Sequence, residues 1–262
     1  MKGGILNLYK KRGETPVERI KRFKIENPTY GEAKMSYAGR LDPMAEGVLL
    51  VLVGEENKNR DHYLEYRKDY IFDALFGVRT DTYDALGKVT EEAEIPYGSE
   101  ELEAQVKEEL SALKGKIVQE YPPYSSKPVQ GPDGGAKKPL FEWARAGKIA
   151  LIDLPETEVE IYEINPVLSY SLPRDMLSRT VFETIVRVNG DFRQKAVFES
   201  WIRFFEKSER ECFTIMRIKI SCSSGTYVRG IVNNLGKKIG IPALALKIVR
   251  TKIGDYRLED SV

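Results

Sequence analysis

The stretch YAGRLDPMAEGVLLVLVGEENK, residues 37–58, places an acid in a stiff turn directly before a long apolar run. Asp42 precedes Pro43, which fixes its own φ and restricts Asp42 to extended or turn geometry. Residues 45–53 are almost entirely apolar and predict a buried element after the turn. This pattern suits a positioned, partly desolvated carboxylate. Taken alone, however, it favours an ordinary Asx turn or helix cap.

Around this stretch the apolar spacing predicts strands and helices that do not alternate regularly. Strands are predicted at residues 4–9, 69–76, 157–164, 180–188 and 212–222. Helices are predicted at residues 16–22, where Thr15 favours the N-cap position, and at 99–113, 140–146, 198–205 and 228–239. Residues 77–87 and 121–135 are expected as connections. The mixture favours an α+β fold, with a mixed, largely antiparallel central sheet flanked by helices and loops.

Length and charge limit the possible partners. The 262 residues, 42% hydrophobic, suffice for one large domain or two small ones, and no linker divides them. The net charge is only +1, but residues 1–40 hold ten Lys/Arg against four Asp/Glu, and residues 213–257 hold nine against one. Residues 81–120 reverse the sign, with eleven acids and four bases. If the two basic ends meet, they form a surface for phosphates; solvated faces give the same pattern.

Several classes of protein are disfavoured by the composition. No apolar run approaches the roughly 18 to 20 residues of a membrane helix, and the N-terminus lacks the features of a secretory signal, so we expect a cytoplasmic protein. A reduced pair is favoured over a disulfide for Cys212 and Cys222. With His62 as the single histidine and no CxxC, we expect neither a metal nor a cofactor.

Residues 37–58 resemble the catalytic motif of the TruB family of tRNA pseudouridine synthases, G-x-L-D-P-x-A-x-G-v-L followed by G-E-x-x-K. Five further segments resemble the family in the same order. They are GILNLYKKRGETP, KDYIFDALFGVRTDTYDALG, QEYPPYSSKPVQG with KPLFEWARAG, CSSGTYVRGIVNNLG and IVRTKIGDYRLEDSV. Six ordered matches between residues 4 and 262 are hard to obtain by chance, and they outweigh the ordinary reading of each segment.

The resemblance implies a pseudouridine synthase fold and isomerisation of uridine 55 in the tRNA T-loop, which needs no redox cofactor. Asp42 would act at the sugar, either at C1′ or at the C2′ proton, and a desolvated carboxylate needs a nearby cation to stay ionised. Arg229 matches the family's arginine, although it could instead bind phosphate or have a purely structural role. Tyr70 would stack on the flipped uracil, although it could be a core residue. Ile248 and Leu49 would supply apolar walls, with core packing the ordinary alternative for Leu49.

Four more residues are expected to bind substrate. Arg40, Lys10 and Arg250 are cations in the matched segments. Tyr37 stands where the family usually has a histidine that enters the space left by the extruded base, and tyrosine can also stack there.

The chain also departs from the family pattern in two ways. It ends soon after the closing motif, so we expect a single catalytic domain, residues 1–262, without the C-terminal PUA domain. Residues 172–210 form an insertion, expected as a substrate lid or as a surface elaboration. We expect tRNA as the partner, no membrane, no obligatory protein partner and a monomer. The alternatives are an RNA-binding tRNA-folding factor and a guide-RNA-dependent rRNA pseudouridine synthase.

Overall fold

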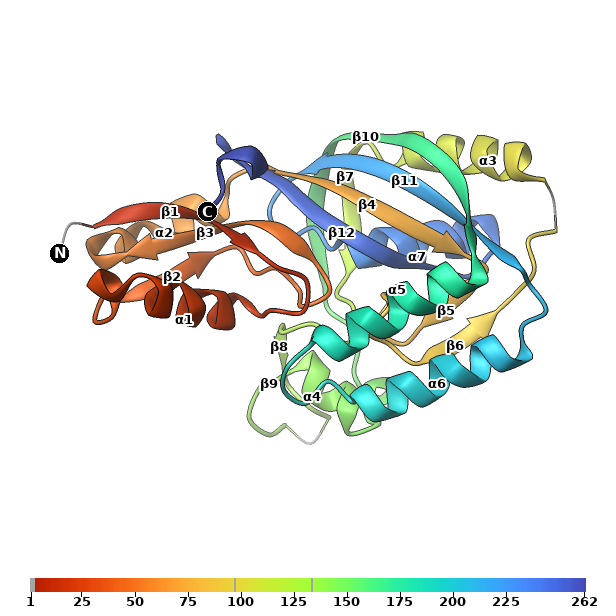
Figure 1. The fold of residues 1–262 in the computed structure, drawn as a ribbon, viewed down its shortest axis with the longest axis horizontal. Coiled ribbons are helices and arrows are strands. Elements are labelled where there is room, and N and C mark those ends of the chain that lie inside the picture. Colours follow the sequence, from red (N-terminus) through yellow and green to blue (C-terminus); the bar gives the residue numbers. More distant parts are fainter. Residues whose placement is uncertain (1–2, 97, 133) are drawn as a thin grey trace.

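A computed structural model of the protein describes residues 3–96, 98–132 and 134–262. Its large sheet is built from β1 (Gly4–Lys10), β2 (Met35–Ala38), β3 (Glu46–Val53), β4 (Lys68–Phe76), β7 (Gly115–Glu120), β10 (Glu156–Pro173), β11 (Cys212–Cys222), β12 (Ala243–Ile253) and β13 (Tyr256–Arg257). The strand order is β1-β3-β12-β4-β11-β10-β7, with β2 on β3 and β13 on β12 (Figure 1). Among the described pairs, β3 with β12 is parallel and the others are antiparallel. The predicted α+β class is confirmed.

The helices lie around this sheet. They are α1 (Pro16–Glu26), α2 (Arg60–Leu64), α3 (Ser99–Ala112), α4 (Leu140–Arg145), α5 (Arg174–Arg187), α6 (Gln194–Lys207) and α7 (Val228–Ile239). Short 3-10 turns occupy Pro28–Tyr30, Gly54–Asn59, Ile149–Leu151 and Leu258–Asp260. Helix α7 packs against α3 and β12. Of the helices that the structure describes, none has the length and apolar composition needed to cross a membrane.

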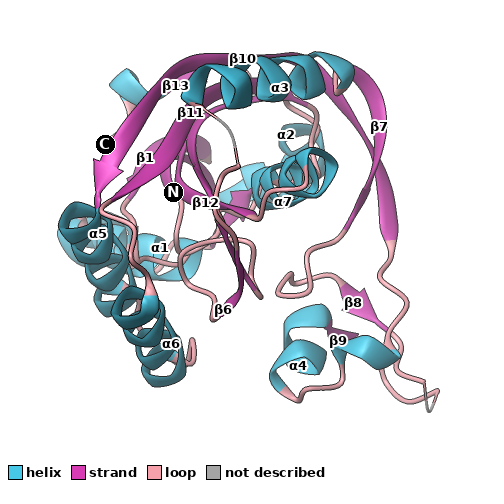
Figure 2. Cartoon of the chain, turned by 90° about the vertical axis from the view of Figure 1, so that its right-hand side faces the viewer, coloured by secondary structure: helices cyan, strands magenta, loops and turns pink. Residues whose placement is uncertain are grey.

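Two small strand pairs complete the fold. They are β5 (Val78–Thr80) with β6 (Val89–Glu92), and β8 (Pro128–Val129) with β9 (Lys138–Pro139). Figure 2 shows the α5–α6 pair and the α4 segment projecting below the large sheet, on opposite sides of β6. Helix α6 is fixed to the body of the protein because the buried Trp201 donates from Nε1 to the Gly87 carbonyl at 3.1 Å. The peptide N–H of Val89 donates to Ser200 Oγ at 3.0 Å.

Most predicted elements are present. The strand at 212–222 and the helix at 228–239 have the predicted bounds, and residues 45–53 contain the buried strand β3. Thr15 caps α1 through a capping box with Glu18, and this helix continues four residues beyond the predicted end at residue 22. The strand at 69–76 and the helix at 198–205 are also found, as parts of β4 and α6.

Two predictions are wrong. The strand predicted at residues 180–188 is helix α5 up to Arg187. Its β-branched residues suggested a strand, but Leu177, Val181 and Ile185 are buried at a spacing of four, because α6 covers this face. The segment 77–87 is not merely a connection, since it contains β5 and buries polar side chains.

Candidate active site

Asp42 lies in the loop between β2 and β3, and Arg250 of β12 forms hydrogen bonds with the backbone of this loop. The guanidinium of Arg250 is 1% exposed and donates to the carbonyl oxygens of Val48 at 2.8 Å, Gly39 at 3.1 Å and Arg40 at 3.2 Å. Three backbone acceptors on both sides of Asp42 are thus fixed by one planar side chain. Arg250 is therefore a structural anchor of the loop, and it also lines the cavity beside Asp42.

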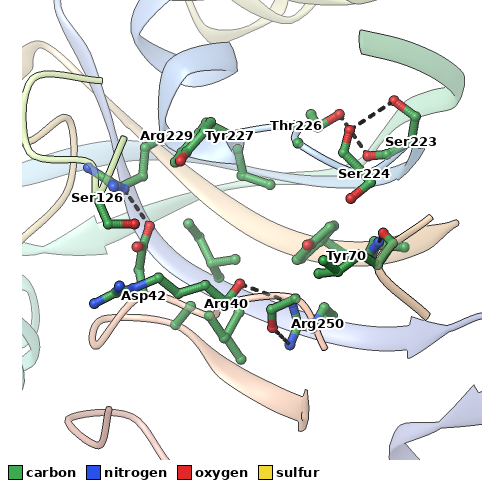
Figure 3. Close-up of a pocket in the computed structure, with 18 residues that line it drawn as sticks. Arg40, Asp42, Tyr70, Ser126, Ser223, Ser224, Thr226, Tyr227, Arg229 and Arg250 are labelled. Atoms are coloured by element: carbon green, nitrogen blue, oxygen red, sulfur yellow. Dashed lines mark hydrogen bonds and ion pairs between the residues drawn. The ribbon is translucent and has the colours of Figure 1, made fainter. Parts of the chain in front are cut away.

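A buried arginine lies between two carboxylates. Arg229, near the start of α7, donates from Nε to Asp42 Oδ2 at 2.8 Å (Figure 3). The same Nε lies 3.4 Å from Asp84 Oδ2, and Nη1 donates to the Thr82 carbonyl at 2.6 Å. The side chain of Arg229 is 3% exposed, that of Asp84 is 6% exposed and that of Asp42 is 29% exposed. Asp42 is therefore the carboxylate of this cluster that a ligand can reach.

Burial and charge act in opposite directions within this cluster. Burial lowers the pKa of the Arg229 guanidinium, but the carboxylates of Asp42 and Asp84 more than offset this, so its pKa is raised. Burial raises the pKa of Asp84 to about 6, although Arg229 and a hydrogen bond from the Thr82 hydroxyl lower it. Asp84 Oδ1 accepts that bond at 2.6 Å and a second from the Leu86 N–H at 2.9 Å.

Asp84 was missed in the sequence, where it appeared as one acid within a polar connection. The available signal was the segment TDTYDALG, in which two threonines and two aspartates stand close together without a proline. Such short side chains hydrogen-bond their own backbone and can support a buried carboxylate. Here Thr80 and Thr82 both donate to the Asp84 carbonyl, so the segment closes on itself.

A cavity of about 230 Å³ opens beside Asp42. Asp42 and Arg229 lie at one end, and Tyr70 lies across the cavity from Asp42 (Figure 3). Ile248 also lines the cavity. The turn at residues 223–226 and the exposed Arg40 complete the wall. The structure thus brings together Asp42, Tyr70, Arg229, Ile248, Arg40 and Arg250.

The phenol of Tyr70 is neutral at the cavity wall. Its residue is 8% exposed, and burial raises its pKa above the ordinary value. Lys68, two residues before Tyr70 on β4, also lines the cavity, and burial lowers its pKa to about 8. One wall of the cavity can therefore offer an aromatic face and a titratable ammonium group.

Two expected substrate-binding residues lie elsewhere. Leu49 is 0% exposed and packs with Leu8, Phe23 and Val51, because side chains alternate across β3 and its side points to α1. Lys10 is also 0% exposed and donates from Nζ to the carbonyl oxygens of Ala45 at 2.6 Å and Glu14 at 2.7 Å. Burial lowers the pKa of Lys10 to about 7. Leu49 is a core residue and Lys10 a support beneath the Asp42 loop, and neither lines the cavity.

Tyr37 lies on β2, outside the cavity lining. Its side chain is partly buried and packs against the small apolar cluster of Leu8 and Phe23. Its carbonyl accepts a hydrogen bond from Arg60 Nε at 3.1 Å. Tyr37 is thus two residues before Gly39, the first residue of this segment that lines the cavity, but does not line it itself.

Comparison with known proteins agrees with this geometry. Residues 27–190 match the family described as TruB family pseudouridylate synthase (N terminal domain). A tRNA pseudouridine synthase B of Caldanaerobacter subterraneus is 31% identical over 98% of this chain and 71% of its own length. The enzyme of the same name from Lactobacillus johnsonii is 31% identical over 100% of this chain and 72% of its own length.

A solved structure shows the same fold. The crystal structure of a Cbf5-Nop10-Gar1 complex contains a chain that aligns with a TM-score of 0.53 at 16% identity. The alignment covers 97% of this chain and 50% of that one, so this chain spans half the length of its structural neighbour. Fold, motif order and relatives agree, and the chain belongs to the TruB family of pseudouridylate synthases.

Proposed function

We propose that this protein isomerises uridine 55 in the T-loop of tRNA to pseudouridine. The observation that carries the proposal is the partly exposed carboxylate of Asp42, paired with the buried Arg229 at the end of a cavity walled by Tyr70 and Ile248. Relatives named tRNA pseudouridine synthase B, aligned over nearly the whole chain, support tRNA as the substrate.

The reaction breaks the bond between uracil N1 and ribose C1′, rotates the base, and joins C5 to C1′. N1 gains a proton and C5 loses one, so atoms balance without an oxidant or reductant. The Asp42 carboxylate serves either by attack at C1′ or by removal of the C2′ proton, and both routes require the ionised form. Arg229 supplies a permanent positive charge at hydrogen-bonding distance, which orients the carboxylate.

Tyr70 and Ile248 receive the base. A uridine within a folded loop must be extruded before Asp42 can reach its sugar, at a cost of a few kcal/mol. Stacking against the aromatic face of Tyr70 offsets part of this cost. Because the pKa of Tyr70 is raised by burial, its hydroxyl stays protonated near neutral pH. Tyr70 therefore acts as a contact and hydrogen-bond donor, not as a phenolate base.

Asp84 acts through Arg229 and is a positioning residue. It is nearly inaccessible to a ligand, and its Oδ2 lies 3.4 Å from the same Arg229 Nε that bonds Asp42. Nη1 of Arg229 also donates to the Thr82 carbonyl, and together these contacts fix the orientation of the guanidinium group. Asp84 therefore aims Arg229 at Asp42 without touching the substrate.

The two basic ends of the chain support binding of RNA. They meet in the fold, since Arg250 donates to the carbonyl oxygens of Gly39 at 3.1 Å and Arg40 at 3.2 Å. We infer that tRNA affinity falls steeply as salt rises, because phosphate contacts release counterions. In this proposal the protein works as a cytoplasmic monomer, in one domain, without a cofactor or an obligatory protein partner.

The test uses unmodified tRNA and the purified full chain, without added metal or cofactor. Pseudouridine is mapped by carbodiimide-blocked reverse transcription, and a single stop at the T-loop uridine is expected. Asp42→Asn abolishes the stop while RNA affinity stays within a few-fold of wild type. Asp61→Asn, on the exposed face of α2, is the matched control and keeps full activity. Turnover by Asp42→Asn, or a stop at another uridine alone, would contradict the proposal.

A further inference from the structure

A second cavity, of about 150 Å³, lies against the other side of Asp42. Arg40, Asp42, Ser126 and Arg229 line both cavities. The two spaces therefore meet along Asp42, and a chain that places one ribose at this carboxylate can extend into the second space.

The walls of the second cavity combine aromatic rings and arginines. Phe141 and Arg145 come from α4, and Phe192 and Arg193 come from the loop that leads into α6. Tyr124 closes the wall between them. Two separate segments thus contribute the same pair of side-chain types. Aromatic faces with guanidinium groups bind nucleobases by stacking and phosphates by charge.

These side chains are held in place by each other. Arg193 donates from Nη1 to Asp81 Oδ2 at 2.7 Å and from Nη2 to Asp81 Oδ1 at 3.1 Å. Its guanidinium carbon lies 4.1 Å from the centre of the Tyr124 ring. Arg145 lies 5.3 Å from the centre of the Phe141 ring and 5.9 Å from that of Phe192. Arg145 thereby connects the α4 wall to the α5–α6 wall.

Backbone strain is concentrated at this cavity. Across the described ranges, the non-glycine residues with positive φ are Tyr83, at 64°, and Arg193, at 59°. Arg193 lines the cavity, and Tyr83 lies between Thr82 and Asp84, which also line it. Such conformations are strained and persist where the surrounding structure enforces them. Arg193 is held by its ion pair with Asp81 and by the hydrogen bond from its N–H to Asp191 Oδ1 at 3.2 Å.

One cation at the junction is free to bind a ligand. Arg40 is exposed, and its guanidinium makes no hydrogen bond or ion pair with another described residue. Arg229, by contrast, is committed to its two carboxylates. A phosphate that passes from one cavity to the other would therefore meet Arg40.

We propose that the second cavity binds the nucleotide adjacent to the target uridine, with its base against Phe192 and Phe141 and the connecting phosphate at Arg40. This inference rests on the proposed function, because it needs the target ribose at Asp42. Consecutive nucleotides share one phosphodiester, so the neighbour is the part of the RNA that reaches this space. Phe192 and Arg193 belong to residues 172–210, outside the segments that resemble the family, so this wall belongs to the insertion expected in this chain.

The test combines RNA and protein changes in one cycle. T-arm stem–loops that lack the base immediately 5′ or 3′ of the target are compared with the intact stem–loop, on wild type and Phe192→Ala. Loss of one base–aromatic stack weakens binding about tenfold or more. Wild type is expected to bind one of the two abasic RNAs about tenfold more weakly than intact RNA. Phe192→Ala is expected to bind intact RNA equally weakly and to lose nothing further with that abasic RNA.

Controls separate a local loss from a folding defect. Phe192→Leu keeps most of the apolar volume without the ring and should weaken binding nearly as much as Phe192→Ala. Val186→Ala changes a side chain of α5 that is 75% exposed, and Lys148→Ala removes an exposed cation beside α4; both should bind like wild type. Additive losses in the cycle, or equal binding of both abasic RNAs and the intact RNA by wild type, would overturn the inference.

The two proposals fail in different ways. If wild type forms pseudouridine in the intact stem–loop but the cycle shows no coupling, the second site is refuted and the function stands. If the coupling is found in binding but no pseudouridine forms, the proposed function is refuted while the nucleotide site remains.

Discussion

The side-chain amide of Gln119 holds both backbone groups of Tyr227. Its Nε2 donates to the Tyr227 carbonyl and its Oε1 accepts from the Tyr227 N–H, each at 2.9 Å. Gln119 is 1% exposed on β7, and Tyr227 is the N-cap of α7. A strand side chain thereby fixes the start of the helix that carries Arg229. The fit is close, because a β carbon on Gly230 would lie 2.7 Å from Gln119 Nε2.

Replacing Gln119 by leucine should destabilise the protein. The variant leaves the Tyr227 N–H unpaired, while the Tyr227 carbonyl keeps only the N–H of Ile231 at 3.1 Å. The expected cost is about 1 to 3 kcal/mol. The free energy of unfolding, measured in urea, should fall by that amount. Gln130→Leu, on an exposed loop, serves as the control and should unfold like wild type. Equal stability of the two variants would show that the amide of Gln119 does not hold α7.

Asp84→Asn should change the pH dependence of catalysis. The pKa of Asp84 is raised to about 6 by burial, so wild type loses this negative charge as the pH falls through 6. Asparagine keeps the size and removes the titration, and Arg229 is then aimed by one carboxylate. We expect single-turnover rates about 10 to 100 times lower than wild type at pH 7, within the range of a misplaced catalytic group. The wild-type single-turnover rate should fall as the pH decreases through about 6, and the variant should show no such fall. The same fall in the variant would show that another group titrates there.

Lys10 predicts a dependence of stability on pH. Burial lowers its pKa to about 7, from 10.5 in the unfolded chain. Between these values the unfolded chain holds a proton that the folded protein has released, so the free energy of unfolding rises with pH. The rise from pH 7 to 8.5 should be about 1 to 2 kcal/mol. Lys10→Met has no such titrating group. The unfolding free energy of this variant minus that of wild type should therefore fall by the same amount between pH 7 and 8.5. Parallel pH curves for the two proteins would refute the assignment.

Gly47→Ala should disrupt the Asp42 loop. Gly47 has φ 113°, and an added β carbon would lie 2.2 Å from the backbone carbonyl oxygen of Arg250. Strain and overpacking together should cost about 2 to 5 kcal/mol, and pseudouridine formation should fall with the loss of the β3–β12 contact. Gly4→Ala, where a β carbon meets nothing within 4 Å, is the control. Thermal unfolding and single-turnover rates on the same samples distinguish the two variants.

Local patterns predicted much of the fold. Residues 212–222 are rich in β-branched side chains, which favour a strand, and the helix at residues 228–239 ends before Gly240, which has φ 73°. These signals are local, so they survive in the folded chain. Helix α5 was misassigned because its β-branched residues favour a strand and its partner α6 lies across a loop. Packing of Phe182 on Phe198, at 4.5 Å between ring centres, stabilises the helix against α6, and no local sequence pattern indicates this contact.

The candidate site was predicted through motif resemblance, and its failures have a physical cause. Motif positions include residues that bind substrate and residues that support the fold, and sequence alone does not separate them. Lys10 carries a charge suited to phosphate, yet three carbonyl oxygens surround its ammonium group. Asp84 and the aromatic wall at Phe192 depend on segments far apart in sequence. Their roles appear only when β5, α4 and the α5–α6 pair are placed together.

The position of β12 between β3 and β4 has a consequence for synthesis of the protein. The loop of Asp42 depends on Arg250, which leaves the ribosome about 200 residues later. At about 5 to 20 residues per second, this interval is roughly 10 to 40 s. During that time β3 and β4, apolar and nearly fully buried in the finished protein, lack the strand that separates them. The nascent chain therefore carries Asp42 without the anchor of its loop, and the edges of β3 and β4 that β12 covers stay unpaired until that strand emerges.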